Sequence, residues 1–162
     1  MTRLKLYVET SVFGFHYDMS AANRSKRLAV RKLFQQIKDG VFEGYVSGLV
    51  IAELGEAPDP YRQRFLRLLG RYGLRSLAYN EDEAARLHQK YLEARVVSTG
   101  VTIDALHIAI ATVAGADVVV SCNLRHLANE LVSRRFLAVN RRQGYGSSLS
   151  IRQPEEVVVY ED

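Results

Sequence analysis

The sequence has few of the features that mark secreted, membrane-spanning or zinc-binding proteins. Its one cysteine, Cys122, excludes an internal disulfide framework and a cysteine-based zinc cluster. No apolar run approaches the roughly 20 residues that span a bilayer. Residues 1–10 lack the apolar stretch and the small-residue cleavage site of a secretory signal. These absences predict a cytoplasmic protein that does not enter a membrane.

Signature motifs of several enzyme classes are also missing. The chain has no Walker-type phosphate loop, no GxGxxG after a strand, no GxSxG nucleophile elbow and no HExxH pair among its four histidines. These absences argue against nucleotide-cofactor folds, serine hydrolases with that elbow and zinc hydrolases. His107, three residues after Asp104, either pairs with that carboxylate or is a buried structural histidine, which is the more ordinary role. Cys122 is expected to pack at the end of a strand.

The length and composition are those of a globular domain. Of the 162 residues, 48% are hydrophobic and 25% are charged. The chain is therefore too apolar to be disordered, and it is long enough to bury a core without disulfides or metals. We expect a single domain over residues 1–162.

The basic residues are mostly arginine. The chain has 22 Lys and Arg against 18 Asp and Glu, a formal net charge of +4, and 17 of the 22 cations are arginine. Arginine matches phosphate oxygens two at a time, whereas lysine acts as a point charge. Clusters at residues 24–32 and 62–75 are explained either by a solvated surface or by a nucleic-acid partner.

Short apolar runs alternate with amphipathic stretches, which is typical of β-α units and a parallel sheet. The valines at 118–120 indicate a central strand that is covered on both faces. Asn80 and Glu83 resemble a capping box at the start of a helix. The pattern predicts strands at residues 4–8, 43–47, 74–79 and 118–120, helices at 25–38, 49–56, 61–72, 80–96, 102–114 and 130–143, and short extended segments at 150–152 and 157–160.

Four polar residues fall where such a sheet places its ligand crevice, at the carboxyl ends of strands and in adjacent helices. Glu9 ends the first strand, and Asn123 follows the strand at 118–120. Asp104 lies in the first turn of the helix before that strand, and Glu53 lies in the helix after the second strand. We expect the four to meet at one edge of the sheet. Each acid taken alone is also explained as a cap or a surface charge.

Acids that share a site repel one another unless a cation joins them. A ligand set of oxygens alone, without Cys or His, is typical of a hard ion such as Mg²⁺ or Mn²⁺, which keeps several waters and binds phosphate oxygens. Such an ion polarises a phosphodiester and supplies a hydroxide. The pattern therefore indicates metal-dependent chemistry on a phosphate ester.

Several strings of residues resemble the motifs of PIN domains. YVETSVFG (7–14) resembles the opening strand and turn, where an acid is followed by Thr or Ser and then Ser. SGLVIAELGEA (47–57) resembles the second segment, with Glu53 at the acidic position. TIDALHIAIATVAGADVVVSCNLRHLAN (102–129) resembles the third and fourth motifs together. With the closing RQPEEVVVYED, the resemblance covers nearly the whole chain and is greatest to the VapC-type toxin branch.

That resemblance implies a Rossmann-like three-layer α/β/α sandwich with a mostly parallel sheet and a Mg²⁺- or Mn²⁺-dependent ribonuclease. It also implies an RNA substrate, a homodimer and, in toxin–antitoxin members, a small antitoxin that covers the acidic pocket. By position, Thr10 or Ser11 hydrogen-bonds near the first acid or the substrate phosphate. The positions of the family's metal-binding and catalytic residues correspond to Glu9, Glu53, Asp104 and, in fourth place, Asn123.

Two positions depart from the family pattern. Glu9 stands where the family usually has Asp, and the extra methylene moves the carboxylate by more than about 1 Å. Asn123 ligates through its carbonyl but brings no charge, so a second ion is expected to bind less tightly. Asp117 is a nearby substitute, although GAD at 115–117 is better explained as a turn into the strand.

Two other functions compete with the metal-dependent ribonuclease. Glu9 and Asn123 are compatible with a degenerate PIN-like module that binds RNA or a partner protein without cutting it. An α/β phosphohydrolase that acts on small phosphate esters is the third hypothesis. RNA binding that ignores salt would favour this third hypothesis, because phosphate contacts are salt-dependent.

Overall fold

The computed structural model describes residues 2–97, 102–123, 129–146 and 148–160. These residues form an α/β structure around one five-stranded sheet in which every pair of neighbouring strands is parallel. The strand order is β3-β2-β1-β4-β5. The strands are β1 (Lys5–Val8), β2 (Glu43–Val46), β3 (Arg75–Ser76), β4 (Val118–Val120) and β5 (Ser150–Arg152).

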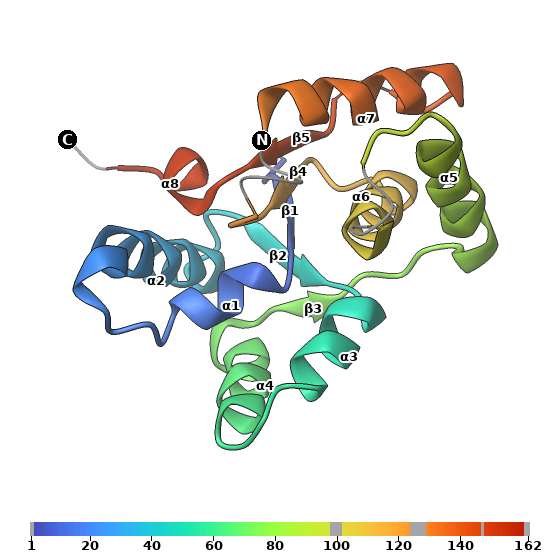
Figure 1. Cartoon of the computed structure of the whole chain (residues 1–162). Coiled ribbons are helices and arrows are strands. Elements are labelled where there is room, and N and C mark those ends of the chain that lie inside the picture. The colour runs from blue at the N-terminus through green and yellow to red at the C-terminus, as the bar shows by residue number, and fades with distance from the viewer. Residues whose placement is uncertain (1, 98–101, 124–128, 147, 161–162) are drawn as a thin grey trace.

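Helices cover both faces of the sheet. Figure 1 shows α1 and α2 on one side of the strands and α5 and α6 on the other, so the parallel α/β fold with three layers is confirmed. The helical elements are α1 (Ser11–Phe15), the 3₁₀ turn η1 (Ala21–Asn23), α2 (Arg24–Lys38), α3 (Gly48–Gly55), α4 (Tyr61–Tyr72), α5 (Glu81–Glu93), α6 (Thr102–Ala114), α7 (Glu130–Arg142) and α8 (Pro154–Val157).

Most predicted elements are present, and the differences lie in short segments. Helices α4 and α6 begin and end where the apolar periodicity predicts. The N-cap of α5 is also confirmed, since the Asn80 side chain accepts a hydrogen bond from the Glu83 backbone at 2.9 Å. The carboxylate of Glu83, however, accepts from the Tyr145 hydroxyl. The extended segment expected at 157–160 is wrong at its start, because Pro at the first helical position and a capping box at Gln153 make residues 154–157 a helix.

The core explains the position of β4. Val118, Val119 and Val120 are all buried, with at most 7% of each residue exposed, as expected for a strand with helices on both faces. Each buried valine stabilises the fold by roughly 1.5–3 kcal/mol. Val119 lies opposite Tyr7 of β1 and Ile151 of β5, so this strand joins the two halves of the sheet.

The order of the strands creates a topological switch point between β1 and β4. The chain passes from β1 to β2 and β3 on one side, and then returns to place β4 on the other side of β1. In open parallel sheets, ligands bind outside the carboxyl ends of the strands at such a point. The residues that follow Val8 and Val120 therefore lie at the position where this fold presents a ligand site.

Asp117 lies at the opposite end of these strands. Its side chain accepts a hydrogen bond from the Lys5 backbone at 2.7 Å, and its own backbone donates to Lys5 at 2.9 Å. Both bonds tie the start of β4 to the start of β1, so the turn role is confirmed and Asp117 does not replace Asn123.

In the part of the chain that the structure describes, no helix is both long and apolar enough to cross a bilayer.

Candidate acid-lined site at the carboxyl edge of the sheet

Glu9 lies at the switch point, directly after β1, and is 4% exposed. Its backbone N–H donates to Val120 at 3.0 Å, which fixes the end of β1 against the end of β4. The carboxylate oxygen Oε2 accepts hydrogen bonds from the Ser11 backbone at 3.2 Å, from the Ser11 hydroxyl and from the Ser121 hydroxyl at 3.0 Å. Burial raises the pKa of Glu9 above its ordinary value, although the hydrogen bonds from Ser11 and Ser121 act in the opposite direction.

Glu53 reaches the same edge from α3, with 24% of its side chain exposed. Its oxygen Oε1 accepts from the Thr10 hydroxyl at 2.6 Å and lies 2.7 Å from Nε2 of His107. Burial acts to raise the pKa of Glu53, but the hydrogen bonds from His107 and Thr10 outweigh it and leave the pKa below its ordinary value. Glu53 is therefore ionised at neutral pH, while neighbouring Glu9 is held in surroundings that disfavour its charge.

Asp104 and Asn123 form the third part of the edge. The Asn123 amide donates to Oδ2 of Asp104 at 3.0 Å, and the Asn123 backbone donates to the Ser121 hydroxyl at 3.0 Å. Because Ser121 also donates to Glu9, an unbroken run of hydrogen bonds connects Glu9 with Asp104. Segments that are far apart in the sequence are thus joined through side-chain and backbone contacts.

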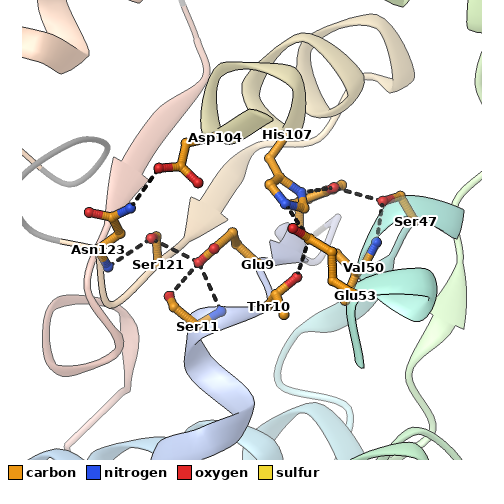
Figure 2. A network of polar contacts seen from close by, with 11 residues as sticks. Glu9, Thr10, Ser11, Ser47, Val50, Glu53, Asp104, His107, Ser121 and Asn123 are labelled. Atoms are coloured by element: carbon orange, nitrogen blue, oxygen red, sulfur yellow. Dashed lines mark hydrogen bonds and ion pairs between the residues drawn. The ribbon is translucent and has the colours of Figure 1, made fainter. Parts of the chain in front are cut away.

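The three acids have one property in common. In each of them, all of the donors found within the described residues reach a single oxygen: Oε2 of Glu9, Oε1 of Glu53 and Oδ2 of Asp104. Figure 2 shows Glu9 between the Asp104–Asn123 pair on one side and the Glu53–His107 pair on the other. The second oxygen of each acid is the one that remains for a ligand.

This donor set fits a hard divalent cation in part. Carboxylate and amide oxygens are the ligands that Mg²⁺ and Mn²⁺ prefer. Among the residues that the structure describes, however, no three His, Cys, Asp or Glu side chains are grouped as an all-protein metal site. Magnesium usually binds through one or two carboxylates, with waters and substrate phosphates completing its shell. The arrangement fits that mode of binding and does not fit a closed protein cage.

The structure brings all six residues singled out by the sequence to this edge. Ser11 hydrogen-bonds the first acid, as the resemblance implies, whereas Thr10 hydrogen-bonds Glu53. The six residues are Glu9, Thr10, Ser11, Glu53, Asp104 and Asn123. Their roles as metal ligands, catalytic groups or substrate contacts stay predictions.

Sequence reasoning missed part of the polar network. His107 is 1% exposed, so it is buried as expected, but its partners are Glu53 and the Tyr7 hydroxyl, while Asp104 pairs with Asn123. Ser121 was also not among the site residues predicted from the sequence. The sequence did contain a signal for a role of His107, because it is the one titratable side chain in the apolar run from 105 to 111.

Cys122 packs at the end of β4, as predicted. Its backbone N–H donates to the Ser11 hydroxyl at 2.9 Å, and burial raises the pKa of its thiol to about 12. The thiol is therefore protonated at neutral pH and is a poor nucleophile or metal ligand.

The arginine clusters divide into two groups. Some cations have internal partners: Arg27 donates to the Asp18 carbonyl at 2.8 Å, and Lys26 lies 2.7 Å from Glu155. By contrast, an exposed stripe on α4 forms no ion pair within the described part of the chain. This α4 stripe consists of Arg64, Arg67 and Arg71.

Residues 124–128, which belong to the third string of the resemblance, lie outside the described residues. No model of a known protein family and no curated protein sequence matches this chain. The function is therefore inferred from the geometry of this edge and from the strings of residues in the sequence.

Proposed function

We propose that this protein is an endoribonuclease of the PIN type, which uses Mg²⁺ or Mn²⁺ to hydrolyse RNA phosphodiester bonds. One observation carries the proposal. Glu9, Glu53 and Asp104 lie at the switch-point edge of the sheet, and each keeps one carboxylate oxygen without a donor in the described structure. Oxygens of this kind, on acids from three separate segments, suit a divalent cation.

The residues divide naturally into ligands and supports. Glu9, Glu53 and Asp104 would hold the ion, with the Asn123 carbonyl in fourth place. When bound, the ion supplies charge stabilisation for the phosphate and a hydroxide for attack. Substrate phosphate oxygens would complete the ligand shell, because the protein alone provides no closed cage.

The remaining side chains hold the acids in place. The Ser11 and Ser121 hydroxyls fix one oxygen of Glu9, and Thr10 fixes one oxygen of Glu53. Burial of Glu9 excludes water from its charge and strengthens its attraction for a cation. Fixed dipoles of this type require no reorganisation when the phosphate becomes more negative during the reaction.

The charge of the protein favours RNA over a neutral substrate. The guanidinium carbon of Arg64, in the α4 stripe, lies 5.9 Å from the ring centroids of Tyr17 and Tyr61. Exposed arginines beside aromatic rings suit phosphates and unstacked bases. We expect RNA binding to weaken steeply as salt rises, which also distinguishes RNA from a small phosphate ester as the ligand.

The test is RNA cleavage by the wild type, Asp104→Asn and Glu53→Gln in the presence of Mn²⁺ or Mg²⁺. Both variants should lose at least about 100-fold in rate, the size expected when a group that stabilises transition-state charge is removed. Glu130→Gln is the matched control, because Glu130 is an exposed acid on α7 that pairs with Arg134. Equal cleavage by the wild type and the two site variants would end the assignment.

A binding module that does not cleave RNA is the second candidate. It is favoured by the uncharged Asn123 and by the lack of a three-acid group in the described structure. Calorimetric titration with Mn²⁺ separates the two candidates. A binding module would retain RNA at low salt, show no Mn²⁺ binding at micromolar concentrations, and leave the RNA intact.

The resemblance to VapC-type toxins extends the proposal to partners. We infer a homodimer in the cytoplasm and a small antitoxin that covers the acid-lined edge. Co-expression with a short reading frame next to the gene should relieve growth inhibition and block cleavage. Light scattering of the purified chain measures its oligomeric state; a monomer would contradict the dimer and leave the nuclease unaffected.

A further inference from the structure

A buried polar chain lies behind Glu53. The Tyr7 hydroxyl is 2.7 Å from the Ser47 hydroxyl and 2.7 Å from Nδ1 of His107. On the far side of the ring, Nε2 of His107 is 2.7 Å from Oε1 of Glu53. Tyr7 and Ser47 have no exposed surface and His107 is 1% exposed. Three segments, β1, the N-cap of α3 and the body of α6, therefore contribute to one hydrogen-bonded path.

One assignment of donors and acceptors satisfies every group in this path. Burial raises the pKa of Tyr7, so its hydroxyl keeps its proton and is able to donate to Nδ1. The Glu53 carboxylate only accepts, so Nε2 of His107 carries the proton between them. Ser47 accepts from the Val50 backbone at 3.3 Å and is free to donate to Tyr7. With His107 as the Nε2–H tautomer, every hydroxyl in the path donates once and accepts once.

The consequence for Glu53 is a fixed carboxylate plane. Two donors, Thr10 and His107, reach the same oxygen, Oε1, from different elements. Rotation of the carboxylate out of this plane would break both bonds and leave a buried imidazole N–H without an acceptor. Oε2 is thereby held away from the donors.

We propose that His107 is a positioning residue that orients Glu53 for a divalent cation, and that Tyr7 and Ser47 set the tautomer that lets it do so. This inference rests on the proposed metal-dependent function. Hydrogen-bonded groups behind a metal ligand typically change metal affinity by 10- to 100-fold when they are removed. His107 itself is not a ligand, because both of its ring nitrogens already have protein partners.

The experiment compares two amide replacements of His107. Glutamine places its amide nitrogen near the position of Nε2, whereas asparagine places it near Nδ1. Isothermal titration with Mn²⁺ alone, without RNA, measures affinity. We expect His107→Gln to bind Mn²⁺ nearly as well as the wild type and His107→Asn to bind it at least about tenfold more weakly.

A second measurement reports on the tautomer directly. Nitrogen-15 NMR of the wild-type His107 ring should show a protonated Nε2 and an unprotonated, hydrogen-bonded Nδ1. Tyr7→Phe removes the donor to Nδ1, so its signal should shift toward that of a free ring nitrogen and Mn²⁺ affinity should fall. If His107→Asn does not fold, Tyr7→Phe is the deciding variant. An unchanged Mn²⁺ affinity in Tyr7→Phe would overturn the proposal.

The chain offers a matched control in a second buried histidine. His16 is 3% exposed, and its Nε2 lies 3.0 Å from the Tyr72 hydroxyl, a pair outside the acid-lined edge. His16→Asn and Tyr72→Phe disturb a similar pair and should cost similar stability without changing Mn²⁺ affinity. A general loss of packing would instead lower affinity in both sets of variants, and that result would overturn the positioning role.

The two proposals fail in different ways. If the wild type binds Mn²⁺ and His107→Asn binds it equally well, the positioning role is wrong and the metal site stands. If the wild type does not bind Mn²⁺, the proposed metal-dependent function fails first, and the positioning role fails with it.

Discussion

Replacing Glu9 with glutamine should make the protein more stable at neutral pH. Burial raises the pKa of Glu9 above its ordinary 4.5, and the hydrogen bonds from Ser11 and Ser121 do not fully offset that effect. The fold therefore tolerates the neutral acid better than the carboxylate. For an acid with a raised pKa, this cost is absent below the unfolded pKa, grows as the pH rises from the unfolded to the folded pKa, and is complete above the folded pKa.

The magnitude follows from what glutamine keeps and what it removes. The amide oxygen still accepts from Ser11 and Ser121, although hydrogen bonds to a neutral acceptor are weaker than those to a charged one. Glutamine removes the negative charge of Glu9, a residue that is only 4% exposed. Single stabilising substitutions typically add about 0.5–2 kcal/mol to the unfolding free energy, and each kcal/mol raises Tm by about 2–4 °C in a chain of this size.

With the proposed cation bound, the wild type should have a higher Tm than Glu9→Gln. The wild type gains about 2.7 kcal/mol when free Mn²⁺ is at 100 times its Kd, because the ion binds only the folded state. Glu9→Gln loses a charged ligand, so its Tm should respond far less to Mn²⁺. The assay is calorimetric unfolding at pH 7 and pH 4 with and without Mn²⁺, and Glu130→Gln is the exposed control.

Two results would refute this reasoning. A lower Tm for Glu9→Gln than for the wild type at pH 7 without metal would mean that the hydrogen bonds dominate over burial. An equal Mn²⁺ shift in both proteins would remove Glu9 from the proposed ligand set. At pH 4 the two proteins should be closer in stability than at pH 7, since the acid is then largely protonated in both states.

Three further predictions concern the site, the acid sensitivity and the core. Asn123→Asp places a second carboxylate at the 3.0 Å contact with Asp104, so we expect Mn²⁺ affinity on the order of tenfold higher by titration and lower stability without metal. Burial lowers the pKa of His16 to about 4 from 6.5, so its contribution to the unfolding free energy is fully present above pH 6.5. Between pH 6.5 and pH 4 we expect urea unfolding to show a decrease of up to about 3 kcal/mol in the unfolding free energy, and a smaller decrease in His16→Gln. Gly44→Ala puts a Cβ 2.6 Å from buried side-chain atoms of Ile37 and Leu74, and should cost about 1–3 kcal/mol.

Much of the fold was predictable because its signals are local. The valines of β4, the apolar stripes of α4 and α6 and the Asn80 cap each depend on residues within one element. The parallel sheet follows from the alternation of those elements. Helix α1 was not predicted, because five residues after Thr10 are too few for a periodic pattern and contain Gly14.

The meeting of the acids was predictable for a topological reason. The carboxyl ends of parallel strands share an edge, so residues after β1 and β4 must lie near each other wherever these strands pair. Glu9 and Ser121 meet for that reason, with 3.0 Å between their side-chain oxygens. Predicting that these residues lie near each other requires only that β1 and β4 pair. It does not require the direction of any side chain.

The partners of individual side chains were not predictable. His107 could reach Asp104 along the helix, three residues earlier, but it lies against Tyr7 and Glu53, which come from two other elements. Helical periodicity indicates which face of α6 a residue occupies. It does not tell which side chains of β1 and α3 reach that face, because this depends on how the helices pack across the sheet.

Asp18 shows what a carboxylate with a purely structural role looks like in this molecule. One of its oxygens accepts from the Ser20 backbone at 3.0 Å and the other accepts from the Asn23 amide at 2.7 Å. The hydrogen bonds from Ser20 and Asn23 lower the pKa of Asp18, so its charged form stabilises the fold above the unfolded pKa and that stabilisation is lost as the pH falls. Glu9 is more deeply buried, yet its donors within the described residues engage only Oε2.

The two acids should therefore respond in opposite directions to the same chemical change. Asp18→Asn removes a charge that the fold favours and one of two satisfied acceptors, so the unfolding free energy at pH 7 should decrease. Glu9→Gln removes a charge that the fold disfavours, so the unfolding free energy should increase. Urea unfolding of both variants beside the wild type measures this difference in sign. A decrease in both would mean that Glu9, like Asp18, is held as a structural acid, and the case for a cation at this edge would lose its physical basis.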